Sequence, residues 1–374
     1  MRVQFSSVIG QHHLKNLLIQ QVQSGKISHA QLFYGDPGYG PLPLALAFVQ
    51  YLFCEDRNES DSCGVCSACK KVQDLQHPDL HFSFPVVQSI GKTSDLFLSD
   101  WRKQVSENPY FDLFEWTNRI DPKGRKPIIS VEESKEILRK LSLKSFEGGF
   151  KVMLIWLPDE MNEQCSNKLL KILEEPPGNT LFILVAESPE NLLVTIQSRT
   201  QKFLVPRIDL DELSSMLKTQ FSKNNSQSAS IAAFAEGNFI KARGLAEDAS
   251  HKQLHRERFI QLMRVCYKKD VIEMLVWAEE LSQDGKETQK LFIQYALHMF
   301  RQSLLQNYMG EDMISASVDE KVFLKNFAPY ITGGNIREFI SLFDDSYYHL
   351  DRNANTKILF TQLCFQTMRY IHLG

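Results

Sequence analysis

Short apolar runs alternate with helix-length patterns over the first two hundred residues of this chain. Five of the runs have the length of a buried strand: 30–34, 80–84, 152–157, 181–186 and 202–205. In the stretches between them, apolar residues recur at helical spacing over 43–53, 131–143 and 162–174. Because strands and helices alternate in this way, the pattern predicts an α/β domain with a parallel sheet covered by helices.

The strand pattern ends near Pro206, and helical patterns follow it. Two short ones, at 210–217 and 228–248, flank a polar stretch rich in Ser and Asn. Longer apolar patterns come after them at 259–277, 289–308 and 358–371. The second half of the chain is therefore expected to be a small helical domain followed by a helical bundle.

These patterns divide the chain into three expected domains. Residues 1–206 form the α/β domain, 207–250 a small helical lid and 251–374 a helical bundle. The stretch 88–127 inside the first domain is rich in Phe and Trp but poorly periodic. We treat it as an insertion, and the sequence assigns it no role.

The composition narrows the class of protein. The 374 residues are 43% hydrophobic and 23% charged, as is typical of globular proteins with two or three domains. The net charge is −3, so no bulk positive field would hold the chain on nucleic acid or on an anionic membrane. The sequence has neither an apolar run of 18 residues nor a secretory signal at its start. We therefore expect a cytoplasmic protein.

A glycine loop follows the first predicted strand and has the order of a phosphate-binding P-loop. An active P-loop reads G-x-x-x-x-G-K-[ST], where the lysine contacts phosphates and the hydroxyl binds Mg²⁺. Gly35, Gly38 and Gly40 are present, but Pro41 and Leu42 stand at the two chemical positions. Proline also removes a backbone N–H that would donate to phosphate. The simplest interpretation of the loop is a turn that binds no ligand.

The acidic pair that an ATPase needs at the end of the next central strand is also missing. Trp156 and Leu157 occupy that position. Asp159 and Glu160 follow closely, but after Pro158 we expect them to begin the next helix, where carboxylates favour the helix dipole. Two independent losses thus predict that the chain does not hydrolyse ATP, and they make nucleotide binding doubtful.

Four cysteines lie within sixteen residues of one another: Cys54, Cys63, Cys66 and Cys69. Four thiolates at this spacing suit a tetrahedral, structural Zn²⁺ with no open position for catalysis. An iron–sulfur cluster and free thiols are the alternatives. His77 and His81 lie nearby, and we expect both to be packing or surface residues.

The order of these motifs resembles the delta-prime family of clamp-loader subunits of bacterial DNA polymerase III, within the AAA+ group. The motifs that match are FSSVIGQ at 5–11, the degenerate loop, the four cysteines, NKLLKILEEPP at 167–177 and TIQSRT at 195–200. The resemblance covers nearly the whole chain and is weakest over 88–127 and the C-terminal third. It implies a RecA-like AAA+ sheet with a zinc-binding insertion, a small helical lid and a C-terminal helical collar.

The resemblance also implies a role for Ser198 and Arg199. In this family a Ser-Arg-Cys motif extends an arginine finger to the ATP bound by a neighbouring motor subunit. Thr200 departs from the motif at its third position, whereas Arg199 keeps the guanidinium. The competing interpretation is that Arg199 only caps a helix or pairs with a carboxylate such as Glu187 or Glu190.

The function implied by the resemblance is that of a non-hydrolysing stator subunit. Its expected partners are the gamma/tau motor subunits and the delta subunit, and through the complex the sliding clamp and primer–template DNA, in the replisome at the nucleoid. Two alternatives stay open: an active motor ATPase of the same loader, against which Pro41, Leu42, Trp156 and Leu157 argue, and a zinc-stabilised adaptor without a role in replication.

Two further sets of residues are weaker candidates. Lys123, Arg125 and Lys126 could contact DNA phosphates, although a solvated loop is the simpler interpretation. The aromatic residues Phe111, Phe114 and Trp116 could form a partner-binding patch or pack under the insertion. The sequence does not separate these last two possibilities.

Overall fold

The computed structural model describes residues 3–147, 149–247, 249–309, 316, 318–352 and 354–373. The chain divides into two compact units. The first comprises Met1–Met216 with Ala235–Ala242, and the second comprises Leu217–Phe234 with Arg243–Gly374. The boundary between the units therefore runs through 207–250, the segment expected to form a lid.

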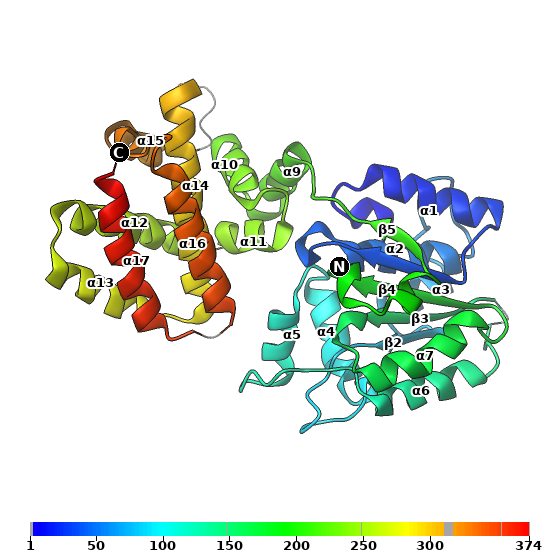
Figure 1. Cartoon of the computed structure of the whole chain (residues 1–374). Helices are drawn as coiled ribbons and strands as arrows, with labels where there is room; N and C mark the ends of the chain where they lie inside the picture. Colours follow the sequence, from blue (N-terminus) through cyan, green and yellow to red (C-terminus); the bar gives the residue numbers. More distant parts are fainter. Residues whose placement is uncertain are drawn as a thin grey trace. The chain divides into compact units, whose positions relative to one another are not determined.

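The strands of the first unit form one parallel sheet (Figure 1). Within the described residues it has five strands: β1 Ala30–Tyr34, β2 Leu80–Ser83, β3 Lys151–Trp156, β4 Thr180–Ala186 and β5 Gln201–Leu204. Their order is β2-β3-β4-β1-β5, and every pairing is parallel. The five strands agree with the predicted positions to within a residue or two, and the predicted α/β fold class is confirmed.

Helices cover both faces of the sheet, because alternate residues of a strand point to opposite faces. Phe33, Leu154 and Ile183 pack on one face, in a core shared with the helices α1 to α5. Leu32 and Phe182 pack on the other face with the helices α6 to α8. The bounds of these helices are α1 His12–Ser24, α2 Pro41–Phe53, α3 Ser67–Gln73, α4 Leu98–Glu107, α5 Leu113–Ile120, α6 Val131–Ser142, α7 Glu163–Glu174 and α8 Val194–Gln197. Figure 1 shows α1 and α2 on one side of the sheet and α6 and α7 on the other.

Local sequence explains where the two helices nearest the candidate site begin. Gly40 caps α2 with φ 93°, a conformation that favours glycine, and Pro41 is the first residue of that helix. Asn162 caps α7 by accepting the N–H of Cys165 at 2.9 Å. The proline pair 176–177 follows the end of α7 and stops it.

The insertion 88–127 is more regular than its sequence indicates, because it contains α4 and α5. Aromatic side chains hold these helices to the sheet. Trp101 stacks on Phe84 with ring centroids 4.4 Å apart, and Trp116 meets Trp101 edge-on at 5.4 Å. Trp101 and Trp116 are fully buried, and Trp116 Nε1 donates to a backbone carbonyl at 2.8 Å. Aromatic packing therefore joins the segment to the core of the α/β unit.

The remainder of the described chain is helical. Its helices are α9 Leu210–Phe221, α10 Asn225–Ala235, α11 Phe239–Glu247, α12 Ala249–Lys268, α13 Val271–Ser282, α14 Lys286–Met309, α15 Val318–Phe327, α16 Ile336–Asp351 and α17 Thr356–Ile371. Short 3₁₀ turns lie at Phe5–Ser7, Pro37–Tyr39, Ser94–Phe97, Pro158–Glu160, Pro189–Asn191 and Ala328–Tyr330. The predicted pattern 259–277 is broken at Lys269, whose φ is 58°, and Asp270 caps α13. In the described part of the chain, no helix has the length and apolar character needed to cross a bilayer.

Candidate functional site

Four backbone N–H groups of the glycine loop between β1 and α2 donate hydrogen bonds to acceptors within the protein. The N–H of Gly35 donates to Ala186 O (3.2 Å), and that of Gly38 donates to the Asp36 carboxylate (2.9 Å). The N–H of Tyr39 donates to Asp36 O (2.8 Å), and that of Gly40 donates to Pro37 O (3.2 Å). Pro37 and Pro41 have no N–H to offer. A P-loop holds phosphates through such N–H groups. Four N–H groups of the loop are therefore engaged within the protein, and the lysine and the hydroxyl are missing.

Trp156 occupies the end of β3, where a Mg²⁺-binding carboxylate would stand in an ATPase. Its side chain is 2% exposed and packs on the ring of Phe111, with centroids 4.9 Å apart. The next carboxylate along the chain, Asp159, lies in the 3₁₀ turn Pro158–Glu160, and α7 begins only at Glu163. Asp159 and Glu160 therefore lie in a separate single turn that follows Pro158, and Asn162, not either carboxylate, caps α7.

Carboxylates gather at the edge of the sheet where phosphates would need positive charge. Burial of its carboxyl, reinforced by Glu160, raises the pKa of Asp159 to about 6. Desolvation, followed by the carboxylates of Asp159 and Asp36, raises the pKa of Glu187 to about 7. Each shift shows that the ionised form is disfavoured here. A triphosphate would add further negative charge to this surface.

Arg199 lies between α8 and β5, with 32% of its side chain exposed. Its Nη1 donates to Thr195 O at 2.8 Å and approaches Ser198 Oγ at 3.4 Å. The Ser198 hydroxyl donates to the same carbonyl at 3.1 Å. The two residues singled out in the sequence are therefore in contact, and they share an anchor on α8.

The carboxylate partner of Arg199 is Glu174, the last residue of α7. Arg199 Nη2 donates to Glu174 Oε1, and the Arg199 Nε is buried without an acceptor among the described residues. The sequence offered Glu187 or Glu190 as partners, and neither is the one observed. An ion pair this exposed typically contributes about 0–1 kcal/mol, so it leaves the guanidinium free to exchange partners.

The four cysteines are brought together, as their spacing predicts. Their sulfur atoms all lie within 4.8 Å of one another, the one such group of possible metal ligands in the described part of the chain. Three backbone N–H groups donate to cysteine sulfur: Cys63 to Cys54 (3.2 Å), Cys66 to Cys63 (3.3 Å) and Cys69 to Cys66 (3.4 Å). Four sulfur donors clustered at the end of α2 and the start of α3 fit a tetrahedral metal ion.

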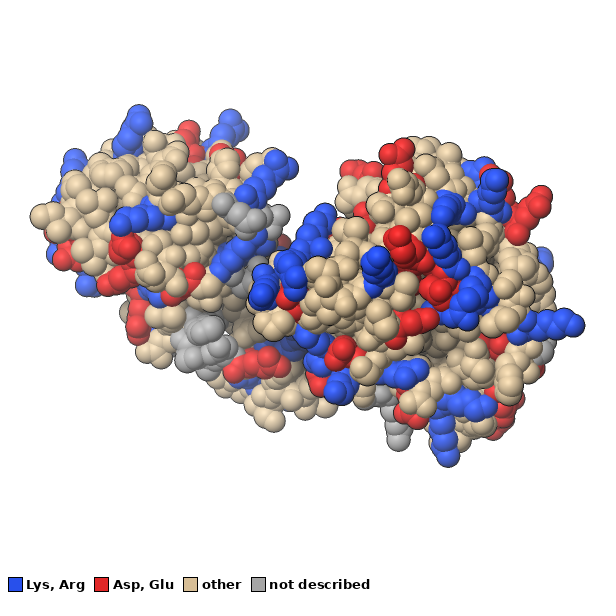
Figure 2. Space-filling model, turned by 90° about the horizontal axis from the view of Figure 1, so that it is seen from below, with Lys and Arg blue, Asp and Glu red and all other residues tan. Residues whose placement is uncertain are grey.

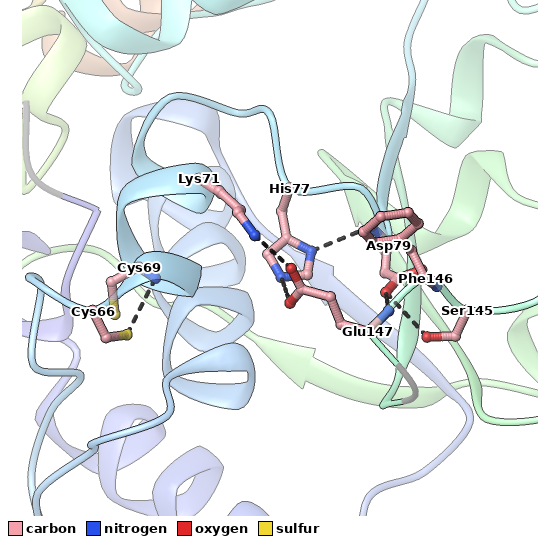
Figure 3. A network of polar contacts seen from close by, with 8 residues as sticks. All are labelled: Cys66, Cys69, Lys71, His77, Asp79, Ser145, Phe146 and Glu147. Carbon is pink, nitrogen blue, oxygen red and sulfur yellow. Dashed lines mark hydrogen bonds and ion pairs between the residues drawn. The ribbon is translucent and has the colours of Figure 1, made fainter.

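A polar network lies beside the cysteine cluster and joins α3 to the loop before β3 (Figure 3). Lys71 on α3 binds Glu147 at 2.6 Å, and Nε2 of the buried His77 lies 3.0 Å from the other oxygen of Glu147. Burial alone would raise the pKa of Asp79, but the N–H groups of Glu147 and Phe146 outweigh it and hold the pKa below its usual value. His77 also stacks on Phe53 at 4.1 Å, so it is a packing residue.

The weaker candidates are explained by local contacts. Arg125 pairs with Asp121 at 2.7 Å, and Lys126 pairs with Glu160 at 3.0 Å. Figure 2 shows one face of the protein, on which basic and acidic side chains are interspersed. Phe111 and Trp116 are buried, whereas Phe114 is 47% exposed. Two of the three aromatic residues therefore pack in the insertion.

Sequence reasoning missed two residues that cover the glycine loop, Tyr110 and Asn238. Tyr110 is buried, and its hydroxyl accepts the N–H of Ile9 at 2.9 Å. The Asn238 side chain donates to Asp36 in the loop at 2.6 Å. Both residues lie far from the loop in sequence, and no local pattern indicates the contact.

A parallel sheet of this strand order, with helices on both faces and a glycine loop between β1 and α2, defines an α/β protein with the layout of a P-loop domain. Residues 10–209 match one protein family over slightly more than half of the chain. The chain belongs to that family, which is described as "DNA polymerase III, delta subunit". This confirms the family resemblance found in the sequence.

Individual relatives carry two kinds of name. The chain is 25% identical over 307 residues to DNA polymerase III subunit delta' of Yersinia pestis, covering 77% of this chain and 79% of that protein. It is 28% identical over 214 residues to subunit tau of Salmonella typhimurium, covering 57% of this chain and 27% of the relative. This chain thus spans about a quarter of the tau relative. A DNA polymerase III gamma subunit-related structure from Thermotoga maritima covers 94% of this chain and 99% of its own, with 14% identity and a TM-score of 0.42.

Proposed function

We propose that this chain is the non-hydrolysing, delta-prime-like stator subunit of a DNA polymerase III clamp loader. In this role it joins gamma/tau motor subunits and a delta subunit, and the complex loads the sliding clamp on primer–template DNA. The observation that carries the proposal is the loop 35–42, in which the N–H groups of four residues are bonded internally and which ends in Pro41 and Leu42. A chain of this family that cannot use ATP must act through its interfaces.

Relatives named tau make an active motor ATPase the second candidate. Three positions argue against it: Pro41, Leu42 and Trp156. Proline and leucine neither neutralise a γ-phosphate nor bind Mg²⁺, and Trp156 is buried in an aromatic cluster. Restoring hydrolysis would need changes in two separate elements, α2 and β3.

Arg199 is the residue through which the stator would assist ATP hydrolysis in a neighbouring subunit. A guanidinium stays charged at all relevant pH values and can stabilise the charge that develops on a neighbour's γ-phosphate. Its partial exposure and its weak pairing with Glu174 support this role. Ser198 contributes by sharing the Thr195 carbonyl with Arg199 Nη1, a contact that orients the guanidinium.

We further propose that the cysteine cluster holds a structural zinc ion. Cys54, Cys63, Cys66 and Cys69 would be its four ligands, and the bound ion would supply a cross-link between α2 and α3. The three N–H groups that donate to sulfur orient the thiolates. No step of catalysis depends on this site.

The test of the stator proposal is a reconstituted loader that contains either wild-type chain or Arg199→Ala. We expect the variant to assemble normally and to lose a substantial part of the DNA-stimulated ATPase, since the other ATP sites of the ring stay intact. Arg139→Ala is the matched control, because Arg139 is also an exposed arginine paired with a glutamate, Glu136, at 2.8 Å. Equal ATPase in wild-type and Arg199→Ala loaders would remove the arginine finger from the proposal.

Recovery of partner subunits distinguishes the stator proposal from the adaptor alternative. A tagged full-length chain should recover the motor and delta subunits from its own cell extract at near-stoichiometric levels. An adaptor without a replication role would recover neither, whatever the state of Arg199. Recovery of these subunits together with no ATPase defect in Arg199→Ala would leave the chain a purely structural member of the ring.

A further inference from the structure

The segment between α4 and α5 lies against the degenerate loop. Tyr110 in this segment is completely buried, and a Cβ atom added to Gly40 would come within 2.8 Å of Tyr110 Cε1. The Tyr110 backbone is clamped by Asn108, whose side chain donates to Tyr110 O at 2.7 Å and accepts from Tyr110 N–H at 3.0 Å. The ring therefore packs on the loop at the residue that caps α2.

A second side chain packs on the same loop from the segment before α11. A Cβ atom added to Gly38 would lie 2.0 Å from Asn238 Oδ1, so only glycine fits there. Asn238 donates to Asp36 at 2.6 Å and accepts the N–H of Lys241 at 3.0 Å. The side chain thus bonds the loop at one end and the first turn of α11 at the other.

The two covering residues are linked through Phe239. Its ring meets the Tyr110 ring edge-on, with centroids 4.9 Å apart. Tyr110 also accepts the N–H of Ile9 at 2.9 Å, which ties in the segment before α1. All of these contacts lie within the first compact unit, of which Ala235–Ala242 is a part.

We infer that Tyr110 and Asn238 occupy, as part of the chain itself, the space over the loop that a nucleotide fills in an active P-loop protein. The inference deepens the proposed function, in which this chain's own site is out of use, and it assigns a role to the insertion. A P-loop needs glycines so that phosphates can approach the backbone. Here Gly38 and Gly40 serve the close approach of Asn238 and Tyr110 instead.

Because Tyr110 and Asn238 belong to the chain, the contacts over the loop do not depend on a bound ligand. A bound nucleotide comes and goes, so contacts made through it depend on the ligand that is present. Tyr110 and Asn238 are covalently part of the chain, and they hold Ala235–Ala242 on the α/β unit whatever the nucleotide concentration. This arrangement suits a subunit that keeps one shape while its neighbours change theirs.

The competing explanation is that Tyr110 is an ordinary core residue whose loss would weaken the whole unit evenly. Tyr51 provides the matched control. It is also a buried tyrosine, 1% exposed, and its hydroxyl donates to Asn58 O at 3.0 Å. It lies in α2, beyond the first turn that packs on the loop. Tyr110→Ala and Tyr51→Ala therefore remove the same side chain from two places on the α/β unit.

The experiment is hydrogen exchange of the isolated full-length chain, read at residues 238–242. The N–H of Lys241 is bonded to the Asn238 side chain and that of Ala242 to the Asn238 carbonyl. We expect Tyr110→Ala to speed exchange at these amides about tenfold or more, and Tyr51→Ala to leave them within about twofold of wild type. Equal exchange at 238–242 in the two variants, or no change in Tyr110→Ala, would overturn the inference.

Chemical rescue adds a readout that general loss of packing does not give. An emptied aromatic site can bind a ligand of matching shape. Saturating phenol, which is the group that the Tyr110→Ala change removes beyond Cβ, should return exchange at 238–242 in this variant toward wild type and should leave it unchanged in Tyr51→Ala. Failure of phenol to slow this exchange in Tyr110→Ala would contradict the claim that Tyr110 fills a discrete site.

A second variant covers the case in which Tyr110→Ala does not fold. Asn238→Ala removes only an amide group, and it should speed exchange at 241 and 242 about tenfold while the cysteine module stays protected. Unchanged exchange in Asn238→Ala would count against the inference. Because the assay uses the isolated chain without partners or ATP turnover, its failure would leave the arginine-finger proposal standing, and loss of that proposal would leave this one intact.

Discussion

Asp159 is one of two carboxyls at the end of the sheet, with Glu187, whose pKa is raised by burial. It carries a carboxyl of which Oδ1 is buried without a partner among the described residues. Burial and Glu160 raise its pKa to about 6, against about 3.9 for an unfolded chain. Folding therefore disfavours the ionised form of Asp159. The free energy of unfolding is highest while the carboxyl is protonated, and it falls as the pH rises through about 6.

We predict that Asp159→Asn stabilises the protein by about 1 kcal/mol near pH 8, where the wild-type carboxyl is charged, with a gain that disappears at about pH 4. Urea unfolding of both proteins across this pH range measures the effect. Glu163→Gln, a change at an exposed carboxyl four residues further on, should show no such gain. A benefit of Asp159→Asn that is independent of pH would mean that packing, not charge, is responsible.

Residue-scale features could be predicted from the sequence only where the partners lie close together in the chain. The four cysteines were found because C-x2-C-x2-C places sulfur atoms on adjacent turns. The Arg199–Glu174 pair was missed, because it depends on where the end of α7 meets the loop before β5. Glu187 and Glu190 are nearer to Arg199 in sequence, but the fold does not pair them with it.

At the scale of elements, the strands were predictable and the insertion was not. Each strand is a short, nearly continuous apolar run, and burial on both faces of a parallel sheet produces such runs. The helices α4 and α5 have only 10 and 8 residues, and aromatic side chains replace the usual periodic aliphatic stripe. Their packing on Phe84 and Trp156 is decided by the sheet, so the sequence of 88–127 alone does not reveal it.

The cysteine module is expected to depend on metal as a unit. Lys71 and His77 connect it to Glu147, so loss of the metal should loosen both the module and the loop at 145–147. We predict about one zinc per chain in a colourless protein, and faster hydrogen exchange at 54–73 and 145–147 after chelation, with α12 to α17 unchanged. A brown protein that contains iron would reject zinc.

Two cysteine variants provide the control for this prediction. Cys66→Ser removes a ligand and should abolish stoichiometric zinc. Cys165→Ser changes a buried cysteine on α7, outside the cluster, and should leave the metal content unchanged. Equal zinc content in both variants would show that the metal is bound elsewhere.

At the scale of the whole molecule, the distribution of charged side chains determines the affinity of the chain for DNA. Binding to DNA without sequence preference depends on Lys and Arg that release counterions from phosphates. The net charge is −3, and on the face in Figure 2 basic side chains lie among acidic ones. Arg125 and Lys126, two of the three basic residues singled out in the sequence, are already paired with Asp121 and Glu160. On this face the chain therefore shows no concentrated positive surface of the kind that DNA binding needs.

We predict that the isolated chain binds primed duplex DNA no more tightly than about 100 μM at 0.15 M salt, the weak end of non-specific affinity. Fluorescence anisotropy measures this, and Lys123→Ala with Lys126→Ala should not change it. The same double variant, placed in a reconstituted loader, should also leave DNA affinity unaltered if the stator contributes interfaces and Arg199 rather than phosphate contacts. Micromolar binding by the isolated chain with a steep salt dependence, lost in the double variant, would instead assign this loop a direct role on DNA.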